Sequence, residues 1–199
     1  MSVIVKICGL TGESDVLAAV DAGADALGFV FAESKRRVSP GHAARISSRV
    51  PAGVLRVAVM LHPAADEWQA VADVFRPDVL QTDADDFRVL DVPDDVARWP
   101  VYREGRSLPG GGRFVYEGPK SGHGETVDWD RAARVARRGE MILAGGLGPD
   151  NVADAVRTVQ PFGVDASSSL EGAPGRKVAA KMKAYVAAAK SAATEMTAR

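Results

Sequence analysis

The sequence has 199 residues and a mass of 20.9 kDa, a length that one domain can fill and that requires no second. Hydrophobic residues make up 46% of the chain and charged residues 26%, which excludes a wholly disordered, collagen-like or membrane protein. The 25 basic and 26 acidic side chains nearly cancel, so the composition creates no field that attracts nucleic acid or anionic lipid. We expect a single domain over residues 1–199 without nucleic-acid or membrane partners.

Cysteine use and the N-terminal run indicate the compartment. A single cysteine rules out an intrachain disulfide framework, as is usual in the reducing cytosol. The N-terminal apolar run is interrupted by Lys6 and lacks the uncharged core of a signal peptide. The most apolar stretch elsewhere, 54–61, contains Arg56 and is far shorter than the ~20 residues that cross a bilayer. These features predict a cytoplasmic protein.

Short β-branched runs alternate with alanine-rich amphipathic segments along almost the whole chain. Strands are expected at 3–7, 26–31, 55–60, 79–81, 101–103, 114–117, 141–144 and 162–165. Helices are expected at 14–22, 40–50, 64–75, 130–138, 149–159 and 177–190. A strand followed by a helix, many times over, is typical of right-handed βαβ units and a parallel sheet.

Eight strands at about 25 residues per unit predict an α/β fold, a compact (β/α)₈ or TIM barrel. The glycine-rich stretch 108–112 leaves no room for a normal fifth helix, and the acidic, proline-broken region 83–95 predicts a short fourth helix. The competing fold is a doubly wound open sheet, which would carry its glycine-rich loop after the first strand. Here the richest glycine cluster follows the seventh strand, which favours the barrel.

The loops after the seventh and eighth strands carry groups suited to an anion. Gly145 and Gly146 follow the seventh strand, and Ser168 and Ser169 follow the eighth. Glycines allow close backbone approach, and free N–H groups and hydroxyls can bind phosphate. Either loop alone could be an ordinary tight turn. Because many barrels hold a substrate phosphate between these two loops, the pair predicts a phosphorylated small-molecule substrate.

Cys8 and Arg36 are candidates at the same face of the barrel. Cys8 ends the first strand, where it is either a small buried hydrophobe or a reactive thiol that Lys6, two residues earlier, could hold as thiolate. Arg36 belongs to a basic loop that either caps the next helix or binds a carboxylate, and the two roles are compatible. The three histidines show no metal-ligand spacing, so no metal is expected.

These residues form a series of motifs that resembles the phosphoribosylanthranilate isomerase family over nearly the whole chain. The matching segments, in order, are VKICGLT at 5–11, GADALGFVF at 23–31, SKR at 34–36, VSP at 38–40, GHGETVDW at 122–129, AGGL at 144–147, NV at 151–152 and PFGVD at 161–165. The resemblance implies a cofactor-free Amadori rearrangement of N-(5-phosphoribosyl)anthranilate to 1-(2-carboxyphenylamino)-1-deoxyribulose 5-phosphate. An acid opens the furanose ring to a Schiff base, and a cysteine removes the C2′ proton.

The resemblance also implies roles for single residues. Cys8 falls on the general base, and Arg36 on the arginine that meets the anthranilate carboxylate. Gln81 and Asp165 fall on substrate-binding positions. The residues that fall in the two phosphate loops are Gly145, Gly146, Ser168 and Ser169.

Two positions depart from the family pattern. The segment LQLHG is replaced by LQTDA at 80–84, which puts Asp83 in place of a histidine. The general-acid aspartate at the end of the sixth strand is absent, and Glu117 is the nearest carboxylate. We expect Glu117 to be the acid, with a pKa raised by the apolar neighbours Phe114 and Tyr116. Asp128, Asp165 and water are the alternatives.

Two other functions stay open at this point. One is a non-catalytic barrel that binds a phosphorylated ligand but has lost the acid. The other is a different phosphate-binding barrel enzyme, such as a sugar isomerase or indole-glycerol-phosphate synthase. Cys8 stands where the two-carboxylate isomerases of histidine biosynthesis usually place an aspartate, which favours the anthranilate substrate. Whether the protein is a monomer or a homodimer is undecided.

Overall fold

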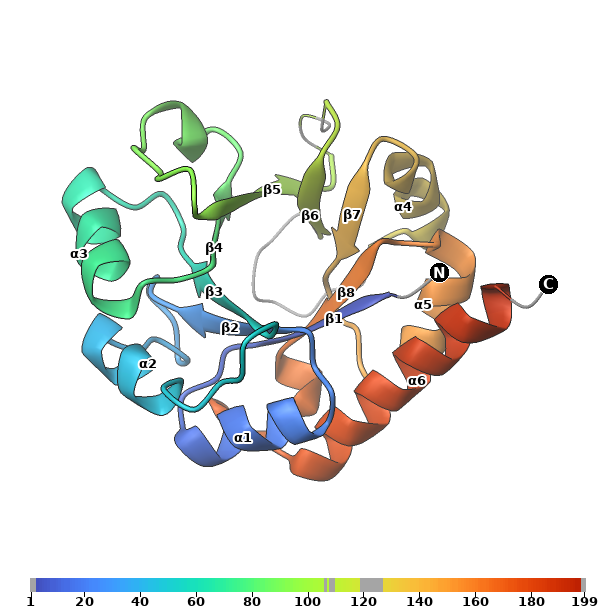
Figure 1. The fold of residues 1–199 in the computed structure, drawn as a ribbon. Coiled ribbons are helices and arrows are strands. Elements are labelled where there is room, and N and C mark those ends of the chain that lie inside the picture. The colour runs from blue at the N-terminus through green and yellow to red at the C-terminus, as the bar shows by residue number, and fades with distance from the viewer. Residues whose placement is uncertain (1–2, 106, 108–109, 119–126, 198–199) are drawn as a thin grey trace.

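Eight parallel strands close into a barrel in chain order in the computed structural model, which describes residues 3–105, 107, 110–118 and 127–197 (Figure 1). The strands are β1 (Ile4–Cys8), β2 (Ala26–Val30), β3 (Leu55–Val59), β4 (Val79–Asp83), β5 (Ala97–Arg103), β6 (Arg113–Glu117), β7 (Glu140–Leu143) and β8 (Gly163–Ala166). The barrel closes where β1 pairs with β8, Lys6 opposite Asp165. The predicted (β/α)₈ barrel is confirmed, and the open sheet is excluded.

Six α-helices in the described ranges surround the barrel on its outer side (Figure 1). They are α1 (Glu13–Asp21), α2 (Pro40–Ile46), α3 (Ala65–Phe75), α4 (Trp129–Ala136), α5 (Val152–Val159) and α6 (Ala179–Thr197). After β4 there is only the 3₁₀ turn η1 (Asp86–Arg88), and the described residues between β5 and β6 contain no helix. The short fourth helix and the missing fifth helix are therefore as predicted. No helix in the described ranges is long and apolar enough to cross a membrane.

Two short elements lie between β8 and α6. The 3₁₀ turn η2 (Ser168–Leu170) follows β8 directly, and an antiparallel hairpin of β9 (Glu171–Ala173) and β10 (Arg176–Lys177) follows η2. Neither element was predicted. The hairpin matters for the site, because its side chains Glu171 and Lys177 contact each other and Glu171 also contacts Arg36.

Strand β5 begins four residues before its predicted start at 101. Pro100 is an unusual residue inside a strand, because proline cannot donate a hydrogen bond to a sheet ladder. The strand nevertheless runs through Pro100 and pairs with β4 from Ala97 onward. The added residues include Trp99, which is buried inside the barrel.

The barrel separates two apolar cores. The outer core lies between strands and helices and contains Phe114 and Tyr116. The inner core fills the barrel and consists of Ala26, Val57, Val79, Trp99, Val101, Val115, Ile142 and Ala144. Since side chains alternate along a strand, Glu117 shares the inner side with Val115. The strand register thus directs Glu117 into the barrel mouth.

Gly28 on β2 makes room for Cys8. A Cβ atom at position 28 would lie 2.7 Å from the Cys8 sulfur, closer than real Cβ contacts allow. The two residues are paired in register between β1 and β2. The second glycine of the GADALGFVF motif therefore has a packing role beside the cysteine.

Candidate active site

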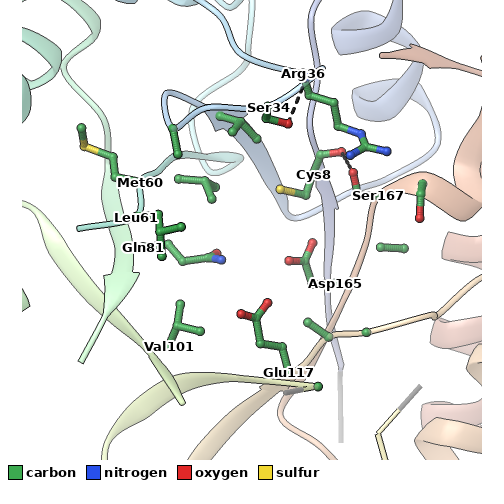
Figure 2. A pocket seen from close by; sticks show the side chains of 18 of the residues that line it. Cys8, Ser34, Arg36, Met60, Leu61, Gln81, Val101, Glu117, Asp165 and Ser167 are labelled. Atoms are coloured by element: carbon green, nitrogen blue, oxygen red, sulfur yellow. Dashed lines mark hydrogen bonds between the residues drawn. The ribbon is translucent and has the colours of Figure 1, made fainter. Parts of the chain in front are cut away.

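A cavity of about 260 Å³ lies at the carboxyl ends of the strands. Eight of the nine residues predicted for the site line it: Cys8, Arg36, Gln81, Glu117, Gly145, Gly146, Asp165 and Ser168. Figure 2 shows Cys8 and Glu117 on opposite sides of this cavity, with Asp165 between them. The ninth residue, Ser169, does not line the cavity, and its hydroxyl donates a hydrogen bond to the Leu147 carbonyl.

Lys6 and Asp165 form a buried ion pair below Cys8. The Lys6 Nζ lies 2.6 Å from Asp165 Oδ2, and the Lys6 side chain has no exposed surface. Burial alone would lower the pKa of Lys6, but Asp165 and the Cys8 sulfur together hold it above the usual value. Lys6 is therefore an ammonium ion with a fixed direction at the base of the cavity.

The Cys8 thiol is not held as a thiolate by this environment. Burial raises the pKa of Cys8, and although Lys6 opposes the shift, the net direction is upward. The sequence-based expectation that Lys6 favours the thiolate gives the right sign for Lys6 alone but omits burial. A thiolate at this position therefore requires a further positive charge close to the sulfur.

The buried ion pair gives a stability prediction. We expect Lys6→Met to lower the free energy of unfolding by about 3–5 kcal/mol, because it leaves Asp165 buried without its counter-ion. Lys190→Met is the matched control, since Lys190 contacts Asp25 at 3.1 Å with both side chains about 40% exposed, and it should cost less than about 1 kcal/mol. Urea unfolding followed by circular dichroism measures both. Equal small losses would show that the buried pair contributes no more than a surface pair.

Three acceptor atoms in the cavity wall have no partner among the described residues. They are Gln81 Oε1, Asp83 Oδ1 and Asp165 Oδ1, all buried. Buried polar atoms are normally hydrogen-bonded, so unpaired ones at a cavity wall indicate a ligand that supplies donors. Hydroxyl groups of a sugar are donors of this kind.

Arg36 is held by a carboxylate from the unpredicted hairpin. Its Nε and Nη2 donate to Glu171 at 2.6 and 2.9 Å, and the buried Lys177 donates to the same carboxylate at 2.9 Å. Burial alone would raise the pKa of Glu171, but Arg36 and Lys177 hold it below the usual value. Arg36 thus lines the cavity, and its contact with Glu171 fixes the orientation of its guanidinium group.

Glu117 has a different neighbourhood from the one predicted. Phe114 and Tyr116 lie in the outer core, on the opposite face of the strand, so they cannot surround the carboxyl group. Its neighbour is Arg103 at the end of β5, with Nε 3.2 Å from Glu117 Oε1. Arg103 was missed, although its even spacing from the buried Val101 on a predicted strand places it in the barrel mouth. The expectation of an apolar pocket around Glu117 is therefore wrong.

Asp128, one alternative acid, lies elsewhere. Its carboxylate caps the start of α4, where it accepts a hydrogen bond from the Arg131 N–H at 3.0 Å. It is not among the residues that line the cavity. The cap explains the residue without a catalytic role.

The two glycines after β7 adopt the left-handed backbone conformation, with φ of 98° at Gly145 and 61° at Gly146. Asn151 fixes this loop: its amide donates to the Gly146 carbonyl at 3.0 Å, and its Oδ1 accepts from the Gly148 N–H at 2.8 Å. The Gly146 carbonyl is thus already hydrogen-bonded to Asn151, and backbone N–H groups of such a turn can bind an anion. On the neighbouring strand, Ser168 begins the 3₁₀ turn η2 directly after β8. The geometry suits the predicted phosphate site.

The described part of the chain contains no cluster of three or more His, Cys, Asp or Glu side chains that could hold a metal ion.

Comparison with known proteins gives consistent matches. The sequence model described as N-(5′-phosphoribosyl)anthranilate (PRA) isomerase matches residues 5–188. A relative from Bordetella pertussis named N-(5′-phosphoribosyl)anthranilate isomerase is 39% identical, with 94% of this chain and 95% of the relative covered. One of the same name from Pelobacter propionicus is 38% identical, with 97% and 98% covered.

Solved structures of similar proteins have the same fold. A phosphoribosyl anthranilate isomerase from Thermotoga maritima superposes with a TM-score of 0.84 at 31% identity and covers 95% of this chain and 99% of its own. A second structure, of an isomerase in complex with reduced 1-(o-carboxyphenylamino)-1-deoxyribulose 5-phosphate, has a TM-score of 0.80, 31% identity and the same coverage.

Proposed function

The chain belongs to the N-(5′-phosphoribosyl)anthranilate isomerase family and is an isomerase of tryptophan biosynthesis, and from this premise we propose that Cys8 and Glu117 carry its acid–base chemistry. The observation that supports the assignment is their position on opposite sides of one cavity, at the ends of β1 and β6 (Figure 2). A substrate that lies between them can receive a proton on one side and lose one on the other.

The substrate has three groups that the cavity can orient. Its phosphate would bind between the Gly145–Gly146 turn and Ser168, with Ser169 contributing through the backbone of η2. Its carboxylate would meet Arg36. Its ribose hydroxyls would donate to the unpaired oxygens of Gln81 and Asp165. Each contact matches one charged or polar group of the substrate with a group already oriented by the protein.

The first chemical step opens the ring. The Glu117 carboxyl transfers its proton to the ring oxygen while the C1′–O bond breaks, and the nitrogen lone pair forms the C1′=N⁺ bond of the Schiff base. The positive charge that develops on the substrate lies in a cavity where Cys8 is close by. That cation lowers the energy of the Cys8 thiolate and offsets the effect of burial.

The second step removes the C2′ proton. The Cys8 thiolate takes this proton, the C2′–H electrons form the C1′=C2′ bond, and the nitrogen regains its lone pair. The resulting enol becomes the ketose when C1′ takes up a proton and the C2′ hydroxyl loses its proton, so that the O–H electrons form the C2′=O bond. The nitrogen of the substrate accepts the electrons, so this reaction needs no cofactor.

A direct assay tests the proposal. The purified protein should convert N-(5-phosphoribosyl)anthranilate, followed through the loss of its fluorescence, and should leave simple aldose phosphates unchanged. A protein that binds reduced 1-(o-carboxyphenylamino)-1-deoxyribulose 5-phosphate (the reduced product) but does not turn over the substrate would instead be a non-catalytic barrel. Turnover of aldose phosphates would favour a different sugar isomerase.

We also propose that residues 1–199 act as one cytoplasmic domain, as a monomer or homodimer, without a nucleic-acid or membrane partner.

Arg36 gives a prediction on substrate binding. We expect Arg36→Ala to lower kcat/KM by about 10–100-fold, because a charge-assisted hydrogen bond to the substrate carboxylate is lost. The neighbouring Arg37 is exposed, and Arg37→Ala is the matched control. Steady-state kinetics of both variants give the answer. Normal kcat and KM in Arg36→Ala would assign this arginine to the hairpin contact with Glu171 alone.

A further inference from the structure

Arg103 lies between two carboxylates at the barrel mouth. Its Nε is 3.2 Å from Glu117 Oε1, and its Nη1 contacts Oδ2 of Asp83. The three side chains come from the ends of the neighbouring strands β4, β5 and β6, and all line the cavity. Each is at most 17% exposed, so water screens their charges only in part. We call Asp83, Arg103 and Glu117 the acid trio.

A general acid at position 117 has two requirements that conflict. Its carboxyl group must be held in one place, and it must carry a proton at the start of the reaction. The guanidinium of Arg103 meets the first requirement through its contact with Glu117. On its own it would work against the second, because a nearby cation favours the carboxylate form.

Asp83 opposes the effect of Arg103 on the protonation of Glu117. Its carboxylate contacts the same guanidinium, and the pKa of Arg103 is held above its usual value by Asp83 and Glu117 against the opposing effect of burial. The charge of Arg103 is thus shared between two carboxylates. The residue that departs from the family pattern at position 83 is the one that supplies the second negative charge.

We propose that Asp83 and Arg103 are positioning residues for the general acid: Arg103 holds the carboxyl group of Glu117 toward the cavity, and Asp83 balances the charge of Arg103 so that Glu117 can keep its proton. The inference rests on the proposed role of Glu117. It concerns residues that do not exchange protons with the substrate themselves. It also gives a reason why a histidine, which carries no negative charge, is absent at position 83.

Two other charged pairs lie near the acid trio among the described residues, and one of them also contacts the trio. On β8 and β1, Asp165 is paired with Lys6 at 2.6 Å. Beyond β4, His62 contacts Asp86 at 2.9 Å, with its Nε2 3.5 Å from the Asp83 carboxylate. The His62 side chain is 63% exposed, so solvent weakens its effect. We therefore expect Asp83 and Arg103 to affect the protonation of Glu117 more than these other charges do.

The test is the pH dependence of kcat, in which activity falls at high pH when the acid loses its proton. In Asp83→Asn the charge of Arg103 is uncompensated, which lowers the pKa of the acid, so the alkaline limb should move to lower pH by about one unit. In Arg103→Gln the facing Asp83 carboxylate raises that pKa, so the limb should move to higher pH by about one unit. Loss of position should also lower the maximal kcat of Arg103→Gln by about 10–100-fold.

Matched controls come from a surface pair of the same composition. Asp85 and Arg88 contact each other at 3.4 Å with about 80% of each side chain exposed, and Asp85→Asn and Arg88→Gln should leave the limb in place. The position of a limb does not depend on how much of a variant is folded. Shifts of opposite sign support the proposal; unmoved limbs, or shifts of equal sign, overturn it.

Glu117→Gln separates this inference from the proposed function on which it rests. If Glu117→Gln keeps wild-type turnover, the acid itself is misassigned and the inference fails with it. If Glu117→Gln abolishes the limb while Asp83→Asn and Arg103→Gln leave it unmoved, only the positioning inference is wrong.

Discussion

Cys8→Ser should lower kcat by about 10²–10⁴-fold, the usual cost of removing a general base. Serine has nearly the same shape as cysteine, but its hydroxyl holds its proton too tightly to be deprotonated at neutral pH. The surroundings of the residue should change little, because Gly28 leaves the same space for either side chain. Stopped assays with N-(5-phosphoribosyl)anthranilate measure the loss.

Binding of the reduced product and thermal unfolding are the controls for Cys8→Ser. Both should stay close to wild type, because the cysteine side chain contributes little to binding and only modestly to packing. A wild-type kcat in this variant would show that Cys8 is a small buried hydrophobe next to Gly28 and that another group removes the proton.

Glu117→Gln should lower kcat by a similar factor, about 10²–10⁴-fold, because glutamine keeps the size and polarity of the side chain but has no acidic proton. Glu117→Asp should restore part of the activity, since it returns the acid with a shorter reach. The matched control is Glu140→Gln on β7, where Glu140 contacts Arg113 at 2.8 Å in an exposed pair at the start of the strand. Steady-state kinetics of the three variants measure the effect.

The result that contradicts the assignment is unchanged turnover in Glu117→Gln. The acid would then be Asp165 or water, because Asp128 caps α4 and does not line the cavity. Asp165 could be tested next, with Lys6→Met as the variant that removes its counter-ion.

The barrel could be predicted because its signals are local. Most units carry their own apolar strand and amphipathic helix, and the alternation of side chains along a strand decides which of them face inward. The glycine-rich segment after β5 and the proline-broken segment after β4 likewise indicated where helices are missing. Strand β5 was predicted too short: it pairs with β4 from Ala97 onward and runs through Pro100.

The partners of the site residues could not be predicted, because they come from distant parts of the chain. Arg36 and Glu171 are 135 positions apart, and Lys6 and Asp165 are 159 apart. No period or motif connects such pairs, so the fixed orientation of Arg36 was unforeseen. The apolar surroundings expected for Glu117 were wrong for a different reason: residues next to each other in a strand face opposite sides of the sheet.

A crystal structure with the reduced product bound tests the central claim most directly, because it places the substrate carbon atoms against both proposed groups. We expect the phosphate between the Gly145–Gly146 turn and Ser168, with the Cys8 sulfur facing C2′. The carboxyl group of Glu117 should lie within about 2.6–3.2 Å of the C4′ hydroxyl, the former ring oxygen. A phosphate bound elsewhere, or a ligand whose C2′ and C4′ oxygen face neither Cys8 nor Glu117, would contradict the account.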